Sequence, residues 1–599
     1  MKIKKRIVAM LLSTTMLLST VGCTSTKDSS GGGSTASADA PTVKLLSMSS
    51  NEKDANIVRD QLTKAGFKVE LNIQPDFSSF QAQQDAGNYD LSITGWTTVT
   101  GNPDYAVRSL FKTGADYNKS GIADSKVDEL VEKASTETAD EYTATYKELE
   151  NVLVDEKAYI APLYSSMKTQ AINKEKVKDV RLSKSRSMVW EGISFVDETK
   201  NATDPLMLSQ TISDLTSLDP IKGNDGSINM LNTNMYARLV NLTDDDKVTS
   251  DGSLSRNHAI ADGNKDFYFV LRDDVNFVKV ENEKAVDSGD KVGAEDIVFS
   301  LERAINKDSV PDHRTYSLHE SMDKVEIVTD LAALEGTKVS GSDTTLKAAL
   351  EEGLKAPISS LVGDKNSVDN ANGKYQVVKV TTKNPFPQVL NYLAHQSAGI
   401  VSKKQVESVN TYDIATYDRT KDVAYGDATS VTKGSTYNNT LATSGPYIMT
   451  YKDDYEAVFE KNPVYMVGTE NEPKIQTIKV KFIKDQDSQL SALRSGEIDV
   501  LYSVPVDKFD LVKNDAKLEL QDIQSNGVQY MLFNMAEGSV TADENVRKAI
   551  LYTINQDEFV AVNQGNVFKA YSTLSPLVKT GNELKADPEK VKELLSTKK

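Results

Sequence analysis

The chain has 599 residues, more than one hydrophobic core usually supports, so we expect several domains. Its 39% hydrophobic and 26% charged residues are typical of a folded globular protein and exclude a disordered or fibrous class. The formal net charge of −18 argues against nucleic acid as a partner, because the phosphates would be repelled.

The first 40 residues are predicted to direct export and anchoring. A basic start and an apolar run over 7–18 make residues 1–22 a signal peptide. Cys23, the only cysteine, follows at once and resembles the acylated cysteine of a bacterial lipobox; the alternative is a plain secretory signal with an incidental cysteine. Residues 24–40 are rich in Ser, Thr and Gly, which favours a flexible tether. We therefore expect a lipid-anchored protein on the extracytoplasmic face of the cell membrane.

Strands and helices alternate after the tether, which predicts α/β layers. The expected strands are 43–48, 69–73, 89–94 and a strand-rich stretch over 159–172. The expected helices are 54–65, 77–86, 125–134 and 138–155.

A second pattern begins with an expected strand at 206–212 and becomes richer in strands and turns over 237–440. Further elements are expected as strands at 267–271, 376–382, 477–483 and 498–501, and as helices at 294–306 and 487–494. From Tyr447 the chain returns to α/β character.

The last helix needs a partner. Asp587 and Pro588 are typical of a helix start, and Val591, Leu594 and Leu595 give the helix one apolar face. The first strand, 43–48, has no helix before it. Placing the tail before the head restores a helix–strand succession, which suggests a circularly permuted chain.

Several motifs together resemble the dipeptide/oligopeptide-binding proteins, family 5 of the extracellular solute-binding proteins. They are FYFVLRDDV at 267–275, AEDIVFSLER at 294–303, TSGPY at 443–447, KNPVY at 461–465, LRSGEID at 493–499, NVRKAI at 545–550 and DPEKVKELL at 587–595. The likeness to the family's C-terminal stretch stands instead at the front, in NYDL at 88–91, Gly95-Trp96 and VDEL at 127–130. The resemblance thus covers nearly all of residues 41–599, in permuted order.

The resemblance implies a type II, cluster C periplasmic-binding-protein-like fold with two lobes and an extra domain. Lobe B would take residues 41–165 and 525–599, lobe A 166–236 and 440–524, and the extra domain 237–439. Chain crossings near 160–175 and 505–525 would form the hinge. The resemblance also implies a monomer without cofactor, which captures peptides and docks on a permease driven by cytoplasmic ATPases.

The resemblance places the ligand on a strand in the cleft, where backbone hydrogen bonds would hold a peptide. The candidate ligand-binding residues are Thr94, Gly95, Trp96, Thr97, Thr98, Asp104, Thr211, Ser213, Asp219, Tyr530 and Asn534. Many relatives carry an acid three residues after the tryptophan, where this chain has Val99, so Asp104 or another acid would have to replace it. The alternatives are a longer peptide, an oligosaccharide or another small solute without an amine, and a surface lipoprotein with a signalling role.

Enzyme and metal sites are not expected. The four histidines, His258, His313, His319 and His395, lack the spacing of a zinc protease. No cysteine nucleophile remains if Cys23 is acylated, and no Gly-x-Ser-x-Gly motif or phosphate-binding loop occurs. The sequence therefore predicts a binding protein that leaves ATP hydrolysis to its partners.

Overall fold

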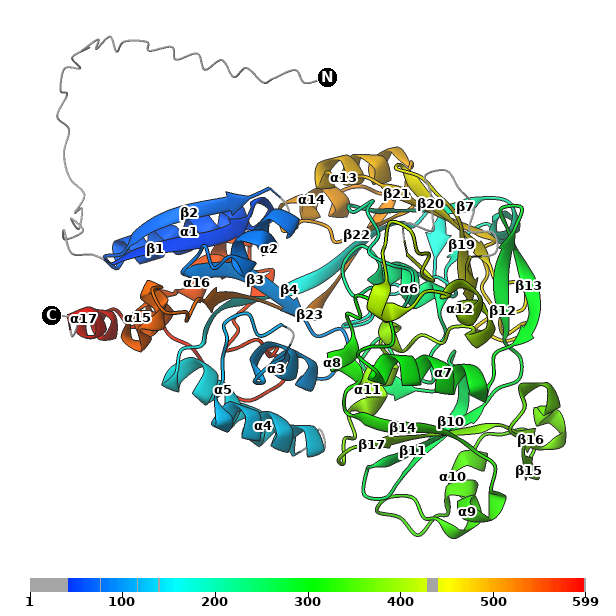
Figure 1. Ribbon diagram of the computed structural model, residues 1–599. Helices are drawn as coiled ribbons and strands as arrows, with labels where there is room; N and C mark the ends of the chain where they lie inside the picture. The colour runs from blue at the N-terminus through cyan, green and yellow to red at the C-terminus, as the bar shows by residue number, and fades with distance from the viewer. Residues whose placement is uncertain (1–40, 76, 116, 138–140, 428–439, 597–599) are drawn as a thin grey trace, which may run out of the picture.

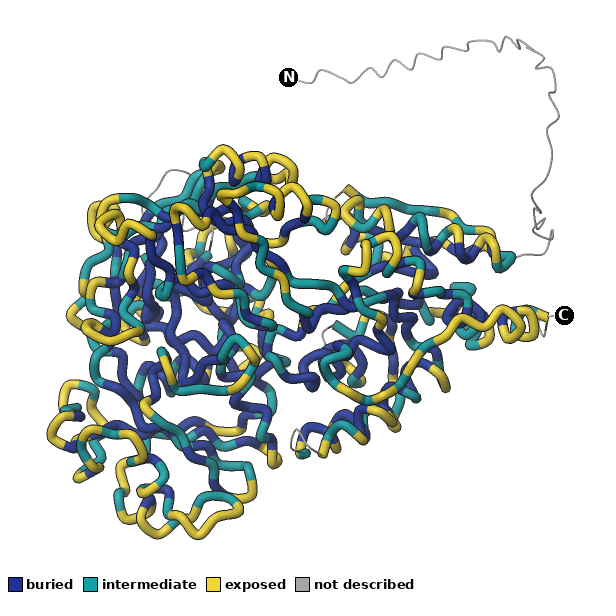
Figure 2. Tube along the Cα trace, turned by 180° about the vertical axis from the view of Figure 1, so that it is seen from behind, coloured by how far each residue is buried: buried dark blue, intermediate teal, exposed yellow. Residues whose placement is uncertain are grey.

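The computed structural model describes residues 41–75, 77–115, 117–137, 141–427 and 440–596, and Figure 1 shows two lobes with a third domain beside one of them. The signal peptide, Cys23 and the tether lie outside the described residues. Within the described ranges, no helix is long and apolar enough to cross a membrane. Figure 2 shows buried residues inside each lobe and along the strands that connect the lobes.

Lobe B is built on a sheet with the strand order β2-β1-β3-β23-β4-β22. Its strands β1, β2 and β3 are parallel, as the helices between them require. The elements are β1 Thr42–Met48, α1 Glu52–Lys64, β2 Lys68–Gln74, α2 Phe77–Asp85, β3 Leu91–Thr97, α3 Asp104–Phe111, α4 Ser125–Thr136, α5 Tyr142–Asn151, α15 Glu544–Thr553, α16 Gln556–Val562, β24 Val567–Phe568 and α17 Pro588–Ser596.

The predicted elements of this part are present, with two differences. Helix α3 was not predicted; Asn102 accepts the N–H of Asp104 with its side chain, and all eight residues of the helix are buried. The helix expected over 138–155 is described from Tyr142 and continues after Asn151 as a π-helical turn, Val152–Glu156, while 138–140 lie outside the described residues.

Two long strands connect the lobes. β4 (Ile160–Asn173) and β23 (Leu518–Phe533) are antiparallel partners, and β22 (Val500–Tyr502) pairs with the far half of β4. The register between β4 and β23 shifts between Gln524 and Val528, where the regular ladder is interrupted. An interruption of this kind gives two continuous strands a place to bend.

Lobe A contains a sheet with the order β19-β20-β21-β7, in which β21 and β7 are parallel. Its core is separate from that of lobe B and includes Trp190 and Tyr447. The elements are β5 Val177–Lys178, β6 Ser194–Phe195, β7 Pro205–Gln210, α6 Asn229–Met235, β19 Tyr447–Lys452, β20 Glu456–Lys461, β21 Thr477–Phe482, α13 Gln486–Ser495 and α14 Phe509–Lys513. Helix α12, Lys403–Val409, comes from the range expected for the extra domain but packs against this core through Val406.

The extra domain surrounds an antiparallel sheet, β10-β11-β17-β14, with α7 packed on it. Its core includes Phe267, Phe269 and Leu301. The elements are β8 Asn241–Leu242, β9 Val248–Thr249, β10 Ser255–Ala261, β11 Asp266–Leu271, β12 Asn276–Glu281, β13 Lys284–Lys291, α7 Ala294–Ile305, α8 Tyr316–His319, β14 Met322–Val328, α9 Leu331–Gly336, α10 Leu346–Glu351, β15 Ser360–Leu361, β16 Lys374–Tyr375, β17 Val377–Thr382, α11 Val389–Leu393 and β18 Ala442–Thr443.

Acid should destabilise the protein through two buried histidines of this domain. His319 Nε2 and His395 Nδ1 each lie 2.8 Å from Ser397 Oγ, and burial lowers the pKa of both rings to about 3. Below pH 6.5 the two histidines become protonated in the unfolded chain but stay neutral in the folded protein. Their contribution to the free energy of unfolding is therefore complete above pH 6.5 and decreases as the pH falls toward 3. Each histidine can remove up to about 1.4 kcal/mol per pH unit.

Urea unfolding at pH 7.5 and at pH 5 measures this loss, and we expect a lower midpoint at pH 5. A His395→Gln variant should show a smaller difference between the two pH values. Equal midpoints at both pH values in the parent protein would contradict the assignment.

The head and the tail of the chain share one core. Val43 and Leu45 of β1 belong to the same buried cluster as Val591 of α17, and Leu594 and Leu595 pack against it. Figure 1 places α17 beside α15 and close to the start of β1. The apolar face expected of the last helix is therefore used inside lobe B.

Candidate functional site

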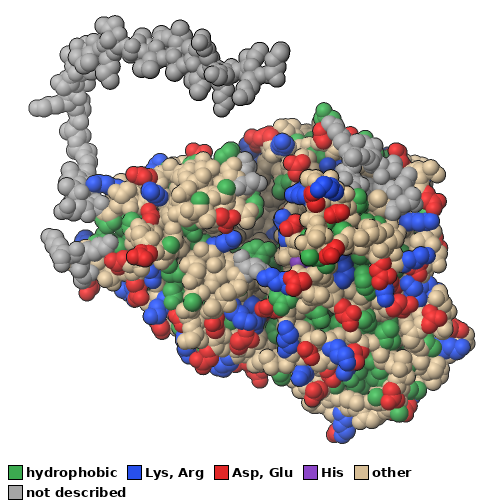
Figure 3. Space-filling model, in the orientation of Figure 1, with side chains coloured by type: hydrophobic (Ala, Val, Ile, Leu, Met, Phe, Trp, Pro, Cys, Tyr) green, Lys and Arg blue, Asp and Glu red, His purple; other side chains and the backbone are tan. Residues whose placement is uncertain are grey.

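The space between the lobes lies at the carboxyl ends of the parallel strands of lobe B. β1 ends at Met48, β2 at Gln74 and β3 at Thr97, on one edge of the sheet. Such an edge is where open α/β sheets bind ligands. Figure 3 shows the surface hollowed between the lobes, at the place where Figure 1 has α2 on one side and α14 on the other.

Strand β3 has an unpaired edge at this cleft. β23 pairs with β3 along its whole length, but β1 pairs only with Leu91 and Ser92, so no described strand lies against the other edge near Gly95 and Thr97. Both residues are exposed, whereas the first three residues of β3 are buried. A sheet edge with unpaired backbone groups is a template for an added strand.

Alternation along the strand identifies which backbone groups face the open edge. The N–H of Thr98 donates to the Asn526 carbonyl, and backbone N–H groups two residues apart point the same way. The N–H groups of Trp96 and Thr94 thus face β23, and those of Gly95 and Thr97 face the cleft. Thr98 itself is buried, so it supports the strand from within.

Trp96 connects lobe B with the extra domain. It packs against the cores of both, and its ring lies 4.9 Å from that of Tyr105 and 5.2 Å from that of Tyr117. Its Nε1 is buried, and no partner for it occurs within the described residues. Trp96 therefore contributes packing between lobe B and the extra domain.

The carboxylate of Asp104 is fully enclosed. Its Oδ2 accepts from Arg108 Nε at 2.9 Å and from the Tyr392 hydroxyl at 2.7 Å, and the side chain is 0% exposed. A buried carboxylate paired in this way is stabilised by its cation and is not open to a ligand amine. Val99, at the place of the acid in the family motif, packs against the core of the extra domain.

The three candidates after β7 fall in two environments. Thr211 is exposed and Ser213 half-buried, just after the end of β7. Asp219 is buried, and its Oδ2 lies 2.6 Å from Arg303 Nη2. Thr211 and Ser213 can reach a solute, whereas Asp219 connects the segment after β7 to Arg303 of α7.

Tyr530 and Asn534 lie away from the cleft edge. Tyr530 is buried in the core of lobe B. Asn534 donates to the Tyr89 carbonyl at 2.8 Å, beyond the pair Phe533–Leu91. That pair is six residues from Thr97 along β3, or about 20 Å at 3.3 Å per residue. These contacts explain both side chains structurally, and sequence spacing alone could not separate the two ends of β23.

The short helix α11 of the extra domain binds directly to lobe B, a contact that the sequence did not reveal. Tyr392 donates to Asp104, Asn391 Nδ2 to the Thr100 carbonyl at 2.9 Å, and Gln388 Nε2 to the Ala134 carbonyl at 3.1 Å. We call Gln388, Asn391 and Tyr392 the α11 clasp. These bonds connect the extra domain with lobe B, so they stabilise the arrangement of the two seen in this structure.

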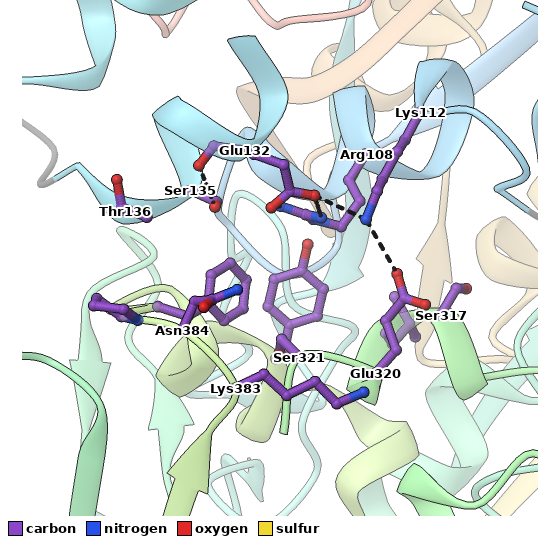
Figure 4. Close-up of a pocket in the computed structure, with 14 residues that line it drawn as sticks. Arg108, Lys112, Glu132, Ser135, Thr136, Ser317, Glu320, Ser321, Lys383 and Asn384 are labelled. Atoms are coloured by element: carbon purple, nitrogen blue, oxygen red, sulfur yellow. Dashed lines mark hydrogen bonds and ion pairs between the residues drawn. The ribbon is translucent and has the colours of Figure 1, made fainter. Parts of the chain in front are cut away.

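A pocket of about 410 Å³ lies beside the clasp, between α3 and α4 on one side and α8 and the loop after β17 on the other (Figure 4). Lys112 Nζ lies 2.8 Å from Glu132 and 3.9 Å from Glu320, and Arg108 lies 2.8 Å from Glu132. Because these charged groups are paired with one another across the pocket, fewer polar groups remain free to bind a solute there than at the open edge of β3. The described residues contain no cluster of histidine, cysteine and acidic side chains that could hold a metal ion.

Comparison with known proteins gives one family. The model of bacterial extracellular solute-binding proteins, family 5 Middle, matches residues 29–118 and 252–599. The glutathione-binding protein GsiB of Salmonella paratyphi A is 22% identical over 389 residues, 64% of this chain and 59% of that protein. The probable D,D-dipeptide-binding periplasmic protein DdpA of Escherichia coli is 26% identical over 184 residues, 31% of each chain.

Similar solved structures are also solute-binding proteins. The periplasmic binding protein DppA of Helicobacter pylori, solved with the peptide STSA, gives a TM-score of 0.45 at 17% identity and covers 67% of each chain. NikA of Staphylococcus aureus, solved with Ni(L-His)2, gives 0.41 at 15% identity over 66% of this chain and 64% of that one. The chain spans 59% of the length of the glutathione-binding relative.

Proposed function

Because the chain belongs to the bacterial extracellular solute-binding proteins of family 5, a family of binding proteins and not of enzymes, we propose that it captures peptides between its lobes for import. The lobes would close on the peptide and present it to the permease of an ABC transporter, whose cytoplasmic ATPases supply the energy. Acylation at Cys23 would hold the protein, as a monomer, at the outer face of the membrane.

The observation that carries this proposal is the open edge of β3. Gly95 and Thr97 direct their N–H groups into the cleft, and a peptide backbone is the solute whose alternating donors and acceptors match such an edge. Thr211 and Ser213 would contact the peptide from the opposite lobe.

Backbone methylation of the ligand tests the proposal. A peptide docked as a strand directs every second N–H toward β3, so N-methylation at alternate positions should weaken binding only for one set of positions. We expect a loss of about tenfold or more per methyl group in that set, because one hydrogen bond is removed and a methyl clashes. Calorimetry with peptides of two to about twenty residues measures this; equal losses at all positions, or no peptide binding, would contradict strand-like docking.

An oligosaccharide or another small solute is the second candidate. Asp104 favours it, because Arg108 and Tyr392 already use the carboxylate that could have neutralised a ligand amine. Native mass spectrometry of the purified protein would separate the candidates by the mass of what it retains. A retained glycan would overturn the peptide assignment.

We also propose that the chain is circularly permuted within its family. The core that β1 and α17 share supports this proposal. The N- and C-termini of the usual family order would be joined in this chain near the 3-10 turn Glu198–Ala202. Lobe B would then comprise residues 41–165 and 525–599, lobe A 166–236 and 440–524, and the extra domain 237–439. A reordered chain that starts at Thr203 and joins residue 596 to residue 41 should keep the thermal midpoint; failure to fold would contradict this.

A further inference from the structure

Three large apolar side chains are exposed at strand ends that face the cleft. Phe77 is 60% exposed, Ile212 43% and Tyr502 38%. None of the three belongs to a hydrophobic cluster among the described residues. A single exposed apolar side chain is common in soluble proteins, but three of them at strand ends next to the space between the lobes make a candidate binding surface.

Sheet topology places all three at the cleft. Phe77 begins α2 directly after β2, whose carboxyl end lies on the same edge as that of β3. Ile212 follows the carboxyl end of β7 in lobe A. Tyr502 is the last residue of β22 and pairs with Gln170 of the connecting strand β4. Figure 3 shows the hollow that these elements surround.

Tyr502 is covered on part of its surface by the connecting strand and is open on the rest. It pairs with Gln170 of β4, and 38% of the residue is exposed. Burial of the covered part raises the pKa of its hydroxyl to about 12. The ammonium of Lys168 lies 5.9 Å from the centre of its ring, which fixes one face and leaves the remainder to a ligand.

The fold does not need Phe77 for its own packing. Phe80, one turn later in α2, is buried at 2% exposure and anchors the helix against Leu46 and Tyr89. The ring of Phe77 stacks on Phe80 at 6.4 Å and presents its other face to solvent. A contact with a solute would therefore bury apolar area that folding leaves exposed.

We propose that Phe77, Ile212 and Tyr502 form an apolar lining that selects peptides carrying large apolar side chains. The proposal rests on the proposed function, because the same extended peptide would lie along β3 and direct alternate side chains to this lining. Its backbone would supply affinity for peptides in general, and the lining would supply the preference among them.

Two matched pentapeptides test the preference, Ala-Leu-Ala-Leu-Ala and Ala-Ser-Ala-Ser-Ala, with nine-residue versions of both. Calorimetry on the full chain should give about tenfold or more tighter binding for the leucine peptide, because it buries apolar area against the lining. Phe77→Ser, Ile212→Ser and Tyr502→Ser should each reduce this ratio about threefold and leave the serine peptide unaffected. Val467→Ser is the matched control, since Val467 is 59% exposed in the loop between β20 and β21 and is not one of the three strand-end residues.

The outcomes separate this inference from the proposed function. Equal affinity for the two peptides, or a ratio that survives in all three variants, would overturn the apolar lining and leave peptide binding intact. Failure of every peptide to bind the parent protein would overturn the proposed function. A reduced ratio in the Val467→Ser control would show that the effect is not local to the cleft, and would also overturn the lining.

Discussion

The Asp104→Ala variant is expected to lose about 3–5 kcal/mol of unfolding free energy, as buried ion pairs do when one partner is removed. The reason is that Arg108, 10% exposed at its side chain, would lose its fully buried partner and keep only Glu132, which is 48% exposed. The Tyr392 hydroxyl would lose its acceptor as well. Urea unfolding followed by circular dichroism measures the change.

Asp60→Ala is the control for this prediction. Asp60 pairs with Arg59 at 2.7 Å, but their side chains are 56% and 38% exposed, and an exposed pair contributes about 0–1 kcal/mol. A loss below about 1 kcal/mol for Asp104→Ala, equal to that of the control, would contradict the structural role of Asp104.

Tyr392→Phe should shift the lobes toward the open form. The substitution removes one hydrogen bond to a carboxylate that connects the extra domain with lobe B, and such a bond contributes about 1.5–3 kcal/mol. The ratio of closed to open molecules should therefore fall about tenfold or more without ligand. Fluorescence energy transfer between dyes on non-natural residues at Lys64 and Asp343 reports the distance between the lobe and the domain.

Tyr375→Phe is the matched control for the α11 clasp. Tyr375 is also buried and donates to the Ala356 carbonyl at 2.9 Å, but both residues belong to the extra domain. It should leave the distance distribution unchanged. An identical distribution for Tyr392→Phe and the parent protein would mean that the clasp does not hold the lobes together.

Much of the fold could be predicted because it follows from local patterns. The apolar run of β1, the alternation in β2 and the apolar face of α17 each specify an element, and the structure confirms all three. α3 was missed because it has only eight residues, and its charged residues Asp104 and Arg108 are buried as a pair instead of marking a solvent face.

The site could be predicted only in part, since its chemistry depends on contacts far apart in the sequence. Trp96 and its strand were expected at the cleft, but the open edge of β3 follows from where β1 stops pairing. The structural role of the Asp104 carboxylate depends on a hydrogen bond from Tyr392, 288 residues later in the sequence. Phe77 and Tyr502 carry no motif, and only their exposure after strand ends reveals them.

Residue-resolved hydrogen exchange with and without a bound peptide tests whether the solute adds a strand to β3. We expect slower exchange at the amides of Gly95 and Thr97 when peptide is bound, with little change at Thr94 and Trp96, whose N–H groups already face β23. Saturating peptide that leaves Gly95 and Thr97 exchanging as before would contradict it.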